Sequence, residues 1–474
     1  MKILVAIANY GLKNRDYLRK LIDEYRSMSY SIDIVVVSNI PKELGSDIEV
    51  RVGLPTKNPW SLPFAHKGIF AKRMRDYDLF IYSEDDILIQ QRNIEAFLRV
   101  QEVLPENEIA GFLRYEESSV GKTPFLSMPD IQAYYHWLAN SIESIGEYSF
   151  ARFSNEHSAC YMLTQNQLQK AIASGGFLVP PHEGRYDLLC TAATDPYTQC
   201  GFTKVICISH IQDFLVHHLS NAYVSETWIG SSELELQINA LLSIKGKRES
   251  QWELFPTRTK LNTAKWDKFY YPGLLKKKKD DVLAPIPEDA QNILSVGCGW
   301  GGQAESKLLQ QGHRVVGIPL DPIIAESAKS RGIEVVCPDF KRARKSLKNE
   351  KFDCILFDNI LQHLPNPVKV LAEYGELLAE KGYMVVTVPN FRYAKYLYEP
   401  YKTKELYKVR KVFDKTHLHF TTPKLVAKWF TQSRLKVVKR KYNINDRFKK
   451  FAIISLGLLG KYLAPEILFV ARKS

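Results

Sequence analysis

Apolar runs of strand length alternate with amphipathic segments along the first part of the chain. Residues 2–8 (KILVAIA) and 32–38 (IDIVVVS) are almost continuously apolar, which is typical of strands buried on both faces of a sheet. Between them, residues 16–28 carry an apolar stripe at helical spacing. The alternation repeats with a strand in residues 78–89 (DLFIYSEDDILI) and an amphipathic helix in residues 94–104. The pattern predicts a parallel sheet covered by helices.

A second alternation of the same kind begins near residue 290. Its predicted strands are residues 293–296, 314–318, 333–337, 352–357, 383–388 and 467–473. Residues 246–285, which include the run KKKKDD, show no clear core pattern and are predicted to be a linker and extension helix. Because 474 residues exceed one typical domain, we predict an α/β fold with two doubly wound domains, residues 1–245 and 286–474.

Cysteine usage and the apolar runs indicate the cellular setting. The seven cysteines are scattered and never form CxxC, which argues against a zinc ribbon or a disulfide framework and favours a reducing compartment. The start, MKILVAIANYG, lacks a small-residue cleavage site and is interpreted as a first strand rather than a secretion signal. No apolar run reaches the length of a membrane span. We therefore expect a cytoplasmic protein.

Charge is distributed unequally between the two predicted domains. Residues 1–250 hold 24 basic and 30 acidic residues, whereas residues 251–474 hold 41 basic and 22 acidic ones. Residues 401–450 alone contain 16 basic and 3 acidic residues. One interpretation is a solvated basic face, and the other is attraction to an anionic membrane or a phosphate-bearing, lipid-linked substrate at the inner membrane face. Nucleic acid is not expected as a partner, because no recognisable binding module accompanies the charge.

Three consecutive carboxylates, Glu84, Asp85 and Asp86, follow an apolar strand. Two like charges about 4 Å apart repel by roughly 4 kcal/mol at an effective dielectric near 20, so a positive partner is expected. Ligands of open α/β sheets bind beyond the carboxyl ends of the strands. Hard divalent cations take one or two carboxylates together with substrate phosphates. These residues predict a metal clamp on a nucleotide diphosphate, with a solvated acidic turn as the alternative.

The segment SEDD resembles the DxD motif of GT-A glycosyltransferases. It is most similar to the EDD variant of the animal N-acetylglucosaminyltransferases that begin complex N-glycan synthesis. Those enzymes also carry a His and a Phe-containing helix before the motif, comparable to FAHKGIF at residues 64–70. The resemblance covers roughly residues 1–230 and is mainly one of pattern. It implies a GT-A-like domain that uses Mn²⁺ or Mg²⁺ and a nucleotide sugar donor.

The resemblance assigns donor and metal roles to individual residues. Asp86, the last acid of the triplet, would contact the metal. Glu84 and Asp85 would contact the sugar, the ribose or metal-bound water. Asn9, at the end of the first predicted strand, and Asn39, directly after the second, are placed in the donor site as well.

An inverting glycosyltransferase needs a general base for the acceptor hydroxyl, usually a carboxylate. The segment PPHEGRYDLLCTAATDPY offers Glu183, Asp187 and Asp195. Asp187, where a loop enters a predicted helix, is preferred and Glu183 is next, with helix capping or a surface role as the competing interpretation of each. GT-A folds often supply a late histidine to the metal. His218 is assigned that role, against a purely structural one.

A glycine-rich turn, VGCGWGG, follows the first strand of the second domain and precedes a helix. Its glycines (Gly297, Gly299, Gly301 and Gly302) allow the backbone to turn tightly and to approach a ligand. A dinucleotide site and an S-adenosylmethionine site both fit this turn. The segments FDCILFDNILQHLPNPVKV and DKTHLHFTTPKLVAKWF decide between them. They resemble class I methyltransferases of the ubiquinone-biosynthesis and sugar O-methyltransferase type, over roughly residues 260–474.

That second resemblance assigns the methyl-donor site. The residues facing the methionine part of S-adenosylmethionine would be Gly297, Cys298 and Gly299, and Gly302 of the same turn would also bind the cofactor. Asp339 and Phe340 would flank the adenine. Asp358 and Asn359, at the end of the fourth strand, would line the cofactor and acceptor side.

Two positions depart from the family pattern. The family usually has an acid two residues before the first glycine, where this chain has Ser295. It also usually has an acid ending the second strand, where this chain has Pro319, and Asp321 is the nearest substitute. Methyl transfer to a hydroxyl needs alignment and a base. His363 and His417 are the candidates, each with a structural alternative.

The two resemblances together predict a bifunctional glycan-modifying enzyme. It would transfer a sugar from a nucleotide sugar to a glycan or lipid-linked glycan and methylate a glycan hydroxyl, in bacterial surface polysaccharide synthesis. One alternative keeps the second domain as an inactive binding module. Another makes the first domain a nucleotidyltransferase.

Overall fold

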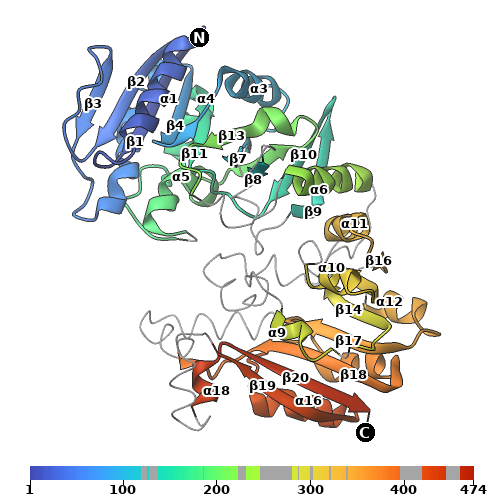
Figure 1. Cartoon of the computed structure of the whole chain (residues 1–474). Helices are drawn as coiled ribbons and strands as arrows, with labels where there is room; N and C mark the ends of the chain where they lie inside the picture. The colour runs from blue at the N-terminus through green and yellow to red at the C-terminus, as the bar shows by residue number, and fades with distance from the viewer. Residues whose placement is uncertain are drawn as a thin grey trace. The chain divides into compact units, whose positions relative to one another are not determined.

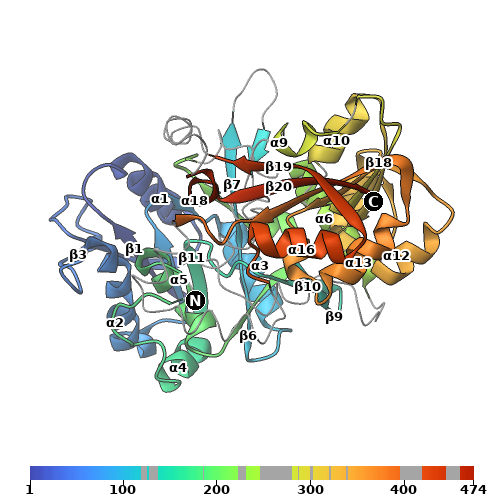
Figure 2. The ribbon, with the colours of Figure 1, turned by 90° about the horizontal axis from the view of Figure 1, so that it is seen from below.

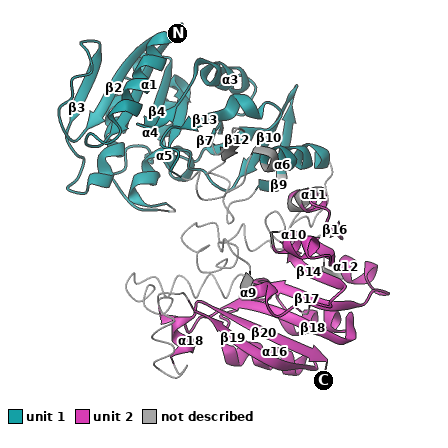
Figure 3. Ribbon diagram, viewed as in Figure 1, with its two compact units in different colours: residues 1–246 teal, residues 247–474 magenta. Residues whose placement is uncertain are grey.

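The structure is a computed structural model of the chain, and it forms two compact units, residues 1–246 and 247–474 (Figure 3). It describes residues 1–118, 125–127, 137–184, 186–222, 231–245, 280–286, 288–298, 303–319, 322–337, 340–394, 419–444 and 459–473. Most of the predicted linker, residues 246–285, lies outside the described residues. The predicted domain limits therefore stay predictions, and each unit is described by itself.

The first unit is built on a five-stranded sheet with the order β11-β4-β1-β2-β3 (Figure 1). Four of its strands run parallel, and β11 is antiparallel to β4. These strands are β1 (Lys2–Asn9), β2 (Ser31–Ser38), β3 (Ile48–Val52), β4 (Leu79–Glu84) and β11 (Cys160–Thr164). The apolar runs predicted as buried strands form its centre, since the side chains of β1 from Ile3 to Ile7 are fully buried.

Two four-stranded sheets complete the first unit. One has the order β6-β12-β10-β9, and the other has the order β5-β13-β7-β8. Their strands are β5 (Ile87–Leu88), β6 (Glu108–Ala110), β7 (Leu113–Ser118), β8 (Phe125–Ser127), β9 (Trp137–Ile145), β10 (Tyr148–Phe153), β12 (Thr203–Cys207) and β13 (Leu215–His218). The helices are α1 (Arg15–Ser27), α2 (Ala65–Lys72), α3 (Gln91–Gln101), α4 (Gln165–Ala173), α5 (Leu188–Thr198) and α6 (Ser231–Ile244), with short 3-10 helices at Pro59–Phe64, Met74–Asp76 and Ile211–Phe214.

The second unit contains a seven-stranded sheet with the order β16-β15-β14-β17-β18-β20-β19, of which β18, β20 and β19 are labelled in Figure 2. The first five strands in this order are parallel, whereas β20 is antiparallel to both of its neighbours. The strands are β14 (Asn292–Cys298), β15 (Arg314–Pro319), β16 (Glu334–Val335), β17 (Phe352–Asp358), β18 (Leu378–Pro389), β19 (Leu435–Asn443) and β20 (Glu466–Lys473). Counted within the unit, the parallel strands follow the Rossmann order 3-2-1-4-5.

Helices cover both faces of this sheet. Leu294 and Val296 of β14 share a core with residues of α12, α13 and α16. Ile293 and Cys298 of the same strand share another core with residues of α10 and α11. The helices are α9 (Asp280–Leu283), α10 (Gln303–Gln310), α11 (Pro322–Ser330), α12 (Phe340–Ser346), α13 (Pro367–Gly375), α16 (Pro423–Gln432) and α18 (Gly460–Leu463), with a 3-10 helix at Leu361–His363. Alternate residues of one strand serve opposite faces, so the fold of this unit is doubly wound and Rossmann-like, as predicted.

Two elements of this sheet differ from the sequence interpretation. The strand predicted over residues 333–337 is only two residues long. It lies at the edge of the sheet and pairs with β15 through Glu334 and Val335. The edge strand β19 was not predicted, since its sequence LKVVKRKYN is dominated by basic residues that are exposed. Lysine-rich edge strands are a common protection against unwanted strand pairing. Among the helices that the structure describes, none is long and apolar enough to cross a membrane.

Candidate functional site

The acidic triplet lies where the central strands of the first unit end. Glu84 is the last residue of β4 and pairs in register with Ala8 of β1, so that Asn9 comes to lie beside Asp85. Asn9 Nδ2 donates a hydrogen bond to Asp85 Oδ2, and Asn14 Nδ2 donates to Asp85 Oδ1 over 2.8 Å. Asp85 is thus held by two amides and is only 8% exposed.

Asn39 lies at the same edge of the sheet as Asn9. Asn39 follows Ser38, the last residue of β2, and Ser38 pairs with Asn9. Asn39 Oδ1 accepts a hydrogen bond from the backbone N–H of Gly11 at 2.7 Å. The loop that carries Gly11 is also held by Lys42, whose Nζ donates to the Gly11 carbonyl. Asn9 and Asn39 therefore lie at the same edge of the sheet, as expected from the ends of adjacent parallel strands, and Asn9 contacts Asp85.

The small sheet of β5, β7 and β13 brings a histidine to Asp86. His218 of β13 pairs with Ile87 of β5, and the Leu219 backbone N–H donates to the carbonyl of Asp86 at 2.8 Å. His218 Nε2 consequently lies 3.1 Å from Asp86 Oδ2. The predicted metal pair, Asp86 and His218, is thus juxtaposed, although the two residues are 132 positions apart in the chain.

Glu116 orients this histidine and was not identified from the sequence. Its carboxylate is fully buried on β7, and Glu116 Oε1 accepts a hydrogen bond from His218 Nδ1 at 2.6 Å. Since Nδ1 is engaged in this way, Nε2 is the ring nitrogen that faces Asp86, and it donates a hydrogen bond there while the imidazole is protonated. The sequence signal that could have identified Glu116 lies in the strand LRYEES. Arg114 and Glu116 are charged and two positions apart, so their side chains share one face of the strand.

The environment raises the pKa of two of the three carboxylates. Burial raises the pKa of Glu84 to about 8, and the neighbouring charge of Asp86 adds to this. Burial likewise raises the pKa of Asp85 to about 7, although the hydrogen bond from Asn14 opposes the shift. Two acids that resist ionisation beside a third indicate a place where added positive charge would be stabilised.

Asp86 and His218 form a charge-paired unit within this cluster. Burial opposes the ionised form of Asp86, but hydrogen bonding to His218 holds its pKa below the usual value. Burial also disfavours a charged His218, yet hydrogen bonds to Asp86 and Glu116 raise the pKa of the imidazole to about 9. The imidazolium therefore supplies positive charge next to the acidic triplet.

These residues fit a divalent cation, in part. Asp86 offers a carboxylate oxygen, and His218 offers an oriented imidazole whose Nε2 can bind a metal once it gives up its proton. The buried Glu84 Oε1 has no hydrogen-bond partner among the described residues and lies 3.7 Å from His157 Nε2. Within the described part of the chain, no group of three His, Cys, Asp or Glu side chains is arranged to hold a metal ion. Two protein ligands match the cation sites that are completed by substrate phosphates and water.

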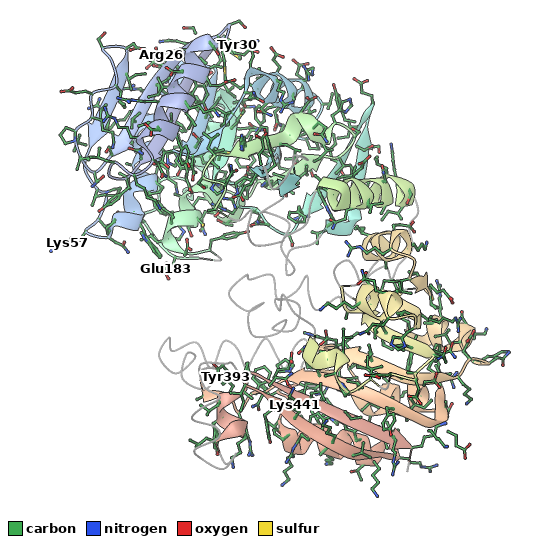
Figure 4. All side chains as sticks on the ribbon, in the orientation of Figure 1. Arg26, Tyr30, Lys57, Glu183, Tyr393 and Lys441 are labelled. Atoms are coloured by element: carbon green, nitrogen blue, oxygen red, sulfur yellow. The ribbon has the colours of Figure 1, made fainter. Side chains whose placement is uncertain are left out.

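The candidate general bases have different surroundings. Asp187 is the N-cap of α5, and its Oδ1 accepts from the Cys190 backbone N–H at 2.9 Å. Its charge nevertheless contributes to the raised pKa of Glu84, so it lies within electrostatic range of the triplet. Glu183 is exposed at the periphery of the unit (Figure 4). Asp195 is fully buried in an ion pair with Lys67, which assigns it to the core.

In the second unit, β14 and β17 end at the point where the strand order reverses, which is where open α/β sheets bind ligands. Gly297, at the end of β14, has a φ of +77°, a conformation that favours glycine. A Cβ on the neighbouring Gly317 would lie 2.9 Å from Cys298 Sγ, so β15 packs closely against this turn. Gly299, Gly302, Asp321, Asp339 and His417 lie outside the described residues, and for Phe340 only its place at the start of α12 is described.

A buried polar network lies at the end of β17. Asn359 has a φ of +55°, unusual for a residue other than glycine, and it is 4% exposed. Its Nδ2 donates to Asp358 Oδ1 at 3.0 Å and to Glu466 Oε2 at 2.8 Å. Thr387 Oγ1 also donates to Asp358. Strained backbone at such a position is typical of functional sites.

His363 lies in the turn after β17. It is 3% exposed, and its Nε2 is 3.1 Å from Gln362 Nε2. Gln362 Nε2 in turn donates to the carbonyl of Asn359 at 2.8 Å. His363 is thus linked through Gln362 to Asn359, the residue predicted to line the acceptor side.

The second unit also matches known proteins in sequence. Residues 269–440 match a family model described as a methyltransferase domain. The C-terminal unit carries a methyltransferase domain. The predicted resemblance to class I methyltransferases is confirmed at this level.

Curated relatives of the methyltransferase domain include two ubiquinone biosynthesis O-methyltransferases. The protein from Haemophilus ducreyi is 27% identical over 175 residues, which cover 34% of this chain and 72% of the relative. The protein from Xylella fastidiosa is 28% identical over 163 residues, which cover 33% of this chain and 65% of the relative. Among solved structures, a methyltransferase dependent on S-adenosylmethionine (SAM) from Archaeoglobus fulgidus is 17% identical, with a TM-score of 0.34, over 44% of this chain and 97% of its own.

The described residues of the methyltransferase domain fit S-adenosylmethionine at the glycine turn. Gly297, with its positive φ, and Cys298 end β14 where the family resemblance places the methionine part. Asp358 and Asn359 end the neighbouring β17 at the same edge. Pro319 does end β15, so no acid stands at the end of that strand to hold the ribose.

Proposed function

We propose that the chain is a bifunctional glycan-modifying enzyme. Its N-terminal unit would transfer a sugar from a nucleotide sugar with the help of Mn²⁺ or Mg²⁺. Its methyltransferase domain would methylate a glycan hydroxyl with S-adenosylmethionine. The single observation that carries the glycosyl-transfer part is the convergence of the triplet Glu84–Asp86 with His218 at the end of a central parallel strand.

Three further features support glycosyl transfer. The triplet begins at the last residue of β4, Asn9 ends the adjacent strand β1, Asn39 follows β2 on the other side of β1, and Glu116 is hydrogen-bonded to His218. A divalent cation, when bound, supplies charge neutralisation for the leaving nucleoside diphosphate. Asp86 and His218 would hold it, and Glu84 and Asp85 would position the donor. Asp187 or Glu183 would accept the proton of the acceptor hydroxyl.

The methyl-transfer part is supported by the family match and by the relatives. Two relatives are named O-methyltransferases, which favours oxygen as the methyl acceptor. Gly297 and Cys298 would bind the methionine part of the donor, Asp358 and Asn359 would orient donor and acceptor, and His363 or His417 would take the hydroxyl proton. Substrates in bacterial surface polysaccharide synthesis, and contact of the basic half with the inner membrane face, are further parts of the proposal.

Product analysis tests the proposal against its alternatives. Purified protein is incubated with a panel of nucleotide sugars, Mn²⁺ and candidate glycans. Release of nucleoside diphosphate supports glycosyl transfer. A parallel reaction with nucleoside triphosphates and sugar 1-phosphates tests the alternative, because a nucleotidyltransferase would release pyrophosphate there. Calorimetric titration with S-adenosylmethionine examines the second unit, because an inert module gives no binding heat.

A further inference from the structure

The outermost strand of the seven-stranded sheet, β19, and the short helix α18 form a basic edge of the second unit (Figure 1). The helix packs on the end of the strand, since a Cβ on Gly460 would lie 3.7 Å from Tyr442 Cδ2. The described residues 419–444 and 459–473 contain ten Lys or Arg side chains. Their one acidic side chain, Glu466, is fully buried. The basic edge therefore carries a large excess of positive charge.

Four side chains of the basic edge carry charge that the described part of the chain does not neutralise. They are Lys436, Lys439 and Arg440 of β19 and Lys461 of α18. The three on β19 are exposed, and none of the four forms an ion pair with an acidic side chain among the described residues. A basic cluster whose field is not cancelled nearby attracts an anionic partner.

Exposed apolar and aromatic side chains lie among these charges. Val438 is the extra residue of a β-bulge in β19 and is 42% exposed. Tyr462 of α18 is 38% exposed, and Lys461 Nζ lies 5.0 Å from the centre of its ring. The Arg440 guanidinium lies 5.5 Å from the ring centre of Tyr442. Basic side chains mixed with exposed aromatic and aliphatic ones are typical of surfaces that lie in a membrane interface.

Protection of the sheet edge alone does not account for this composition. Lysines and a bulge on an edge strand hinder its pairing with another chain. The exposed Val438 has the opposite effect, because apolar side chains on an edge strand favour such pairing. Lys461 and Tyr462 belong to a helix, where no strand edge needs protection. A partner that takes up both charge and apolar side chains accounts for all three.

The basic edge ends beside the residues that the proposed function assigns to the acceptor. Strands β17, β18 and β19 run in the same direction, since β20 is antiparallel to both of its neighbours. Asn443, at the end of β19, donates to Glu466 Oε1 at 2.7 Å, and Asn359, after β17, donates to Glu466 Oε2 at 2.8 Å. Three strand spacings, about 14 Å, separate the ends of β17 and β19.

We propose that the basic edge docks the methyltransferase domain on a membrane surface rich in anionic lipid. The lipid phosphates contact its four unneutralised basic side chains, and Val438 and Tyr462 enter the headgroup region. The inference deepens the proposed function and rests on its membrane-linked acceptor. A lipid-linked glycan held in that membrane would approach the methyl-donor site from the end of β19.

Vesicle flotation with the full-length protein tests this assignment. One set of vesicles contains phosphatidylglycerol and phosphatidylcholine in equal parts, and the other contains phosphatidylcholine alone. K439Q/K461Q removes one charge from β19 and one from α18, and V438S removes the apolar side chain of the bulge. K345Q/K348Q is the matched control, because Lys345 and Lys348 are exposed where α12 leads to the opposite, amino end of β17. Thermal unfolding without vesicles checks the folding of each variant.

The wild type should float with phosphatidylglycerol vesicles, stay unbound with phosphatidylcholine alone, and lose binding as the salt concentration rises. K439Q/K461Q should bind about 25-fold more weakly, because each basic residue near an anionic surface contributes about five-fold in affinity. K345Q/K348Q should bind like the wild type. V438S should bind more weakly at every salt concentration, because salt does not screen apolar contacts.

The outcomes separate docking from the proposed function. A wild type that stays unbound with phosphatidylglycerol vesicles overturns the docking. Equal losses in K439Q/K461Q and K345Q/K348Q would show attraction to the total charge of the domain and overturn the assignment to the basic edge. Unchanged binding of V438S overturns its entry into the headgroup region.

Calorimetric titration with S-adenosylmethionine is the independent readout for the methyl-donor site. K439Q/K461Q should bind S-adenosylmethionine like the wild type, because the basic edge is no part of that site. Equal loss of both kinds of binding in this variant would show a general defect and overturn the docking role. A wild type that floats with the vesicles but binds no S-adenosylmethionine overturns methyl transfer and leaves the docking in place.

Discussion

At the scale of single residues, neighbours in sequence have opposite electrostatic character. Glu84 and Asp85 have raised pKa values, of about 8 and 7, because burial disfavours their charge. Asp86, the next residue, has a lowered pKa because His218 is hydrogen-bonded to it. Position within the fold, and not residue type, decides which acid is ready to face a cation.

Glu116 is expected to control metal affinity through His218. Replacement E116Q keeps the shape of the side chain but removes the charge that orients His218 Nδ1. Loss of such an outer partner typically lowers metal affinity by about 10–100-fold. Mn²⁺ binding in the presence of a nucleoside diphosphate, followed by electron paramagnetic resonance, measures the effect. E117Q is the control, since Glu117 is the exposed next residue of β7, and equal affinities of the two variants would contradict the role of Glu116.

His66 is expected to make the first unit sensitive to acid. It is fully buried, stacked on Tyr82, and hydrogen-bonded to the Pro63 carbonyl and the Tyr161 hydroxyl. Burial, and then the charge of Lys67, hold its pKa well below the usual 6.5. Below pH 6.5, His66 becomes protonated in the unfolded chain but stays neutral in the folded protein. The free energy of unfolding therefore falls as the pH falls.

The variant H66Q isolates this contribution. Relative to it, the wild type should lose up to about 1.4 kcal/mol of unfolding free energy per pH unit below pH 6.5. Urea unfolding, monitored by hydrogen exchange of the amides in β1 and β4, gives the free energy of unfolding at each pH. Parallel pH profiles for the two proteins would show that His66 does not titrate differently in the folded and unfolded states.

At the scale of elements, helix α5 allows the capping role of Asp187 to be tested separately from a catalytic role. Asp187 accepts the Cys190 backbone N–H and caps the helix. D187N should retain the cap, because Asn and Asp cap about equally well, whereas D187A should destabilise the first unit by about 1 kcal/mol. If Asp187 is also the general base, D187N should lose roughly 10²–10⁴-fold in kcat for nucleoside diphosphate release. Full activity of D187N would leave Asp187 with the capping role alone.

Helices and strands were predicted well where the residues of a single element contained a recognisable local pattern. The buried parallel strands and the glycine turn were identified because apolar runs and glycines are visible within a few residues. The pairing of β13 with β5 and β7, which joins His218 to Asp86 and Glu116, spans more than 100 residues and has no local signature.

At the scale of the whole molecule, the two compact units should respond to different ligands. S-adenosylmethionine at 100 times its dissociation constant should stabilise its own unit by about 2.7 kcal/mol. Hydrogen exchange read by mass spectrometry should then show protection in β14 and β17 but none in β1 and β4. Mn²⁺ with a nucleotide sugar should give the reverse pattern. Protection of β4 by S-adenosylmethionine alone would contradict separate sites.

The insertion of β20 between β18 and β19 has a consequence for how the second unit assembles. Among the strands that the structure describes, β19 (residues 435–443) pairs only with β20 (residues 466–473). A nascent chain that has emerged as far as residue 465 therefore exposes an edge on β18 and leaves β19 unpaired, while every strand of the first unit is already available. A ribosome-bound chain stalled there should be digested by protease within the second unit and resist digestion in the first.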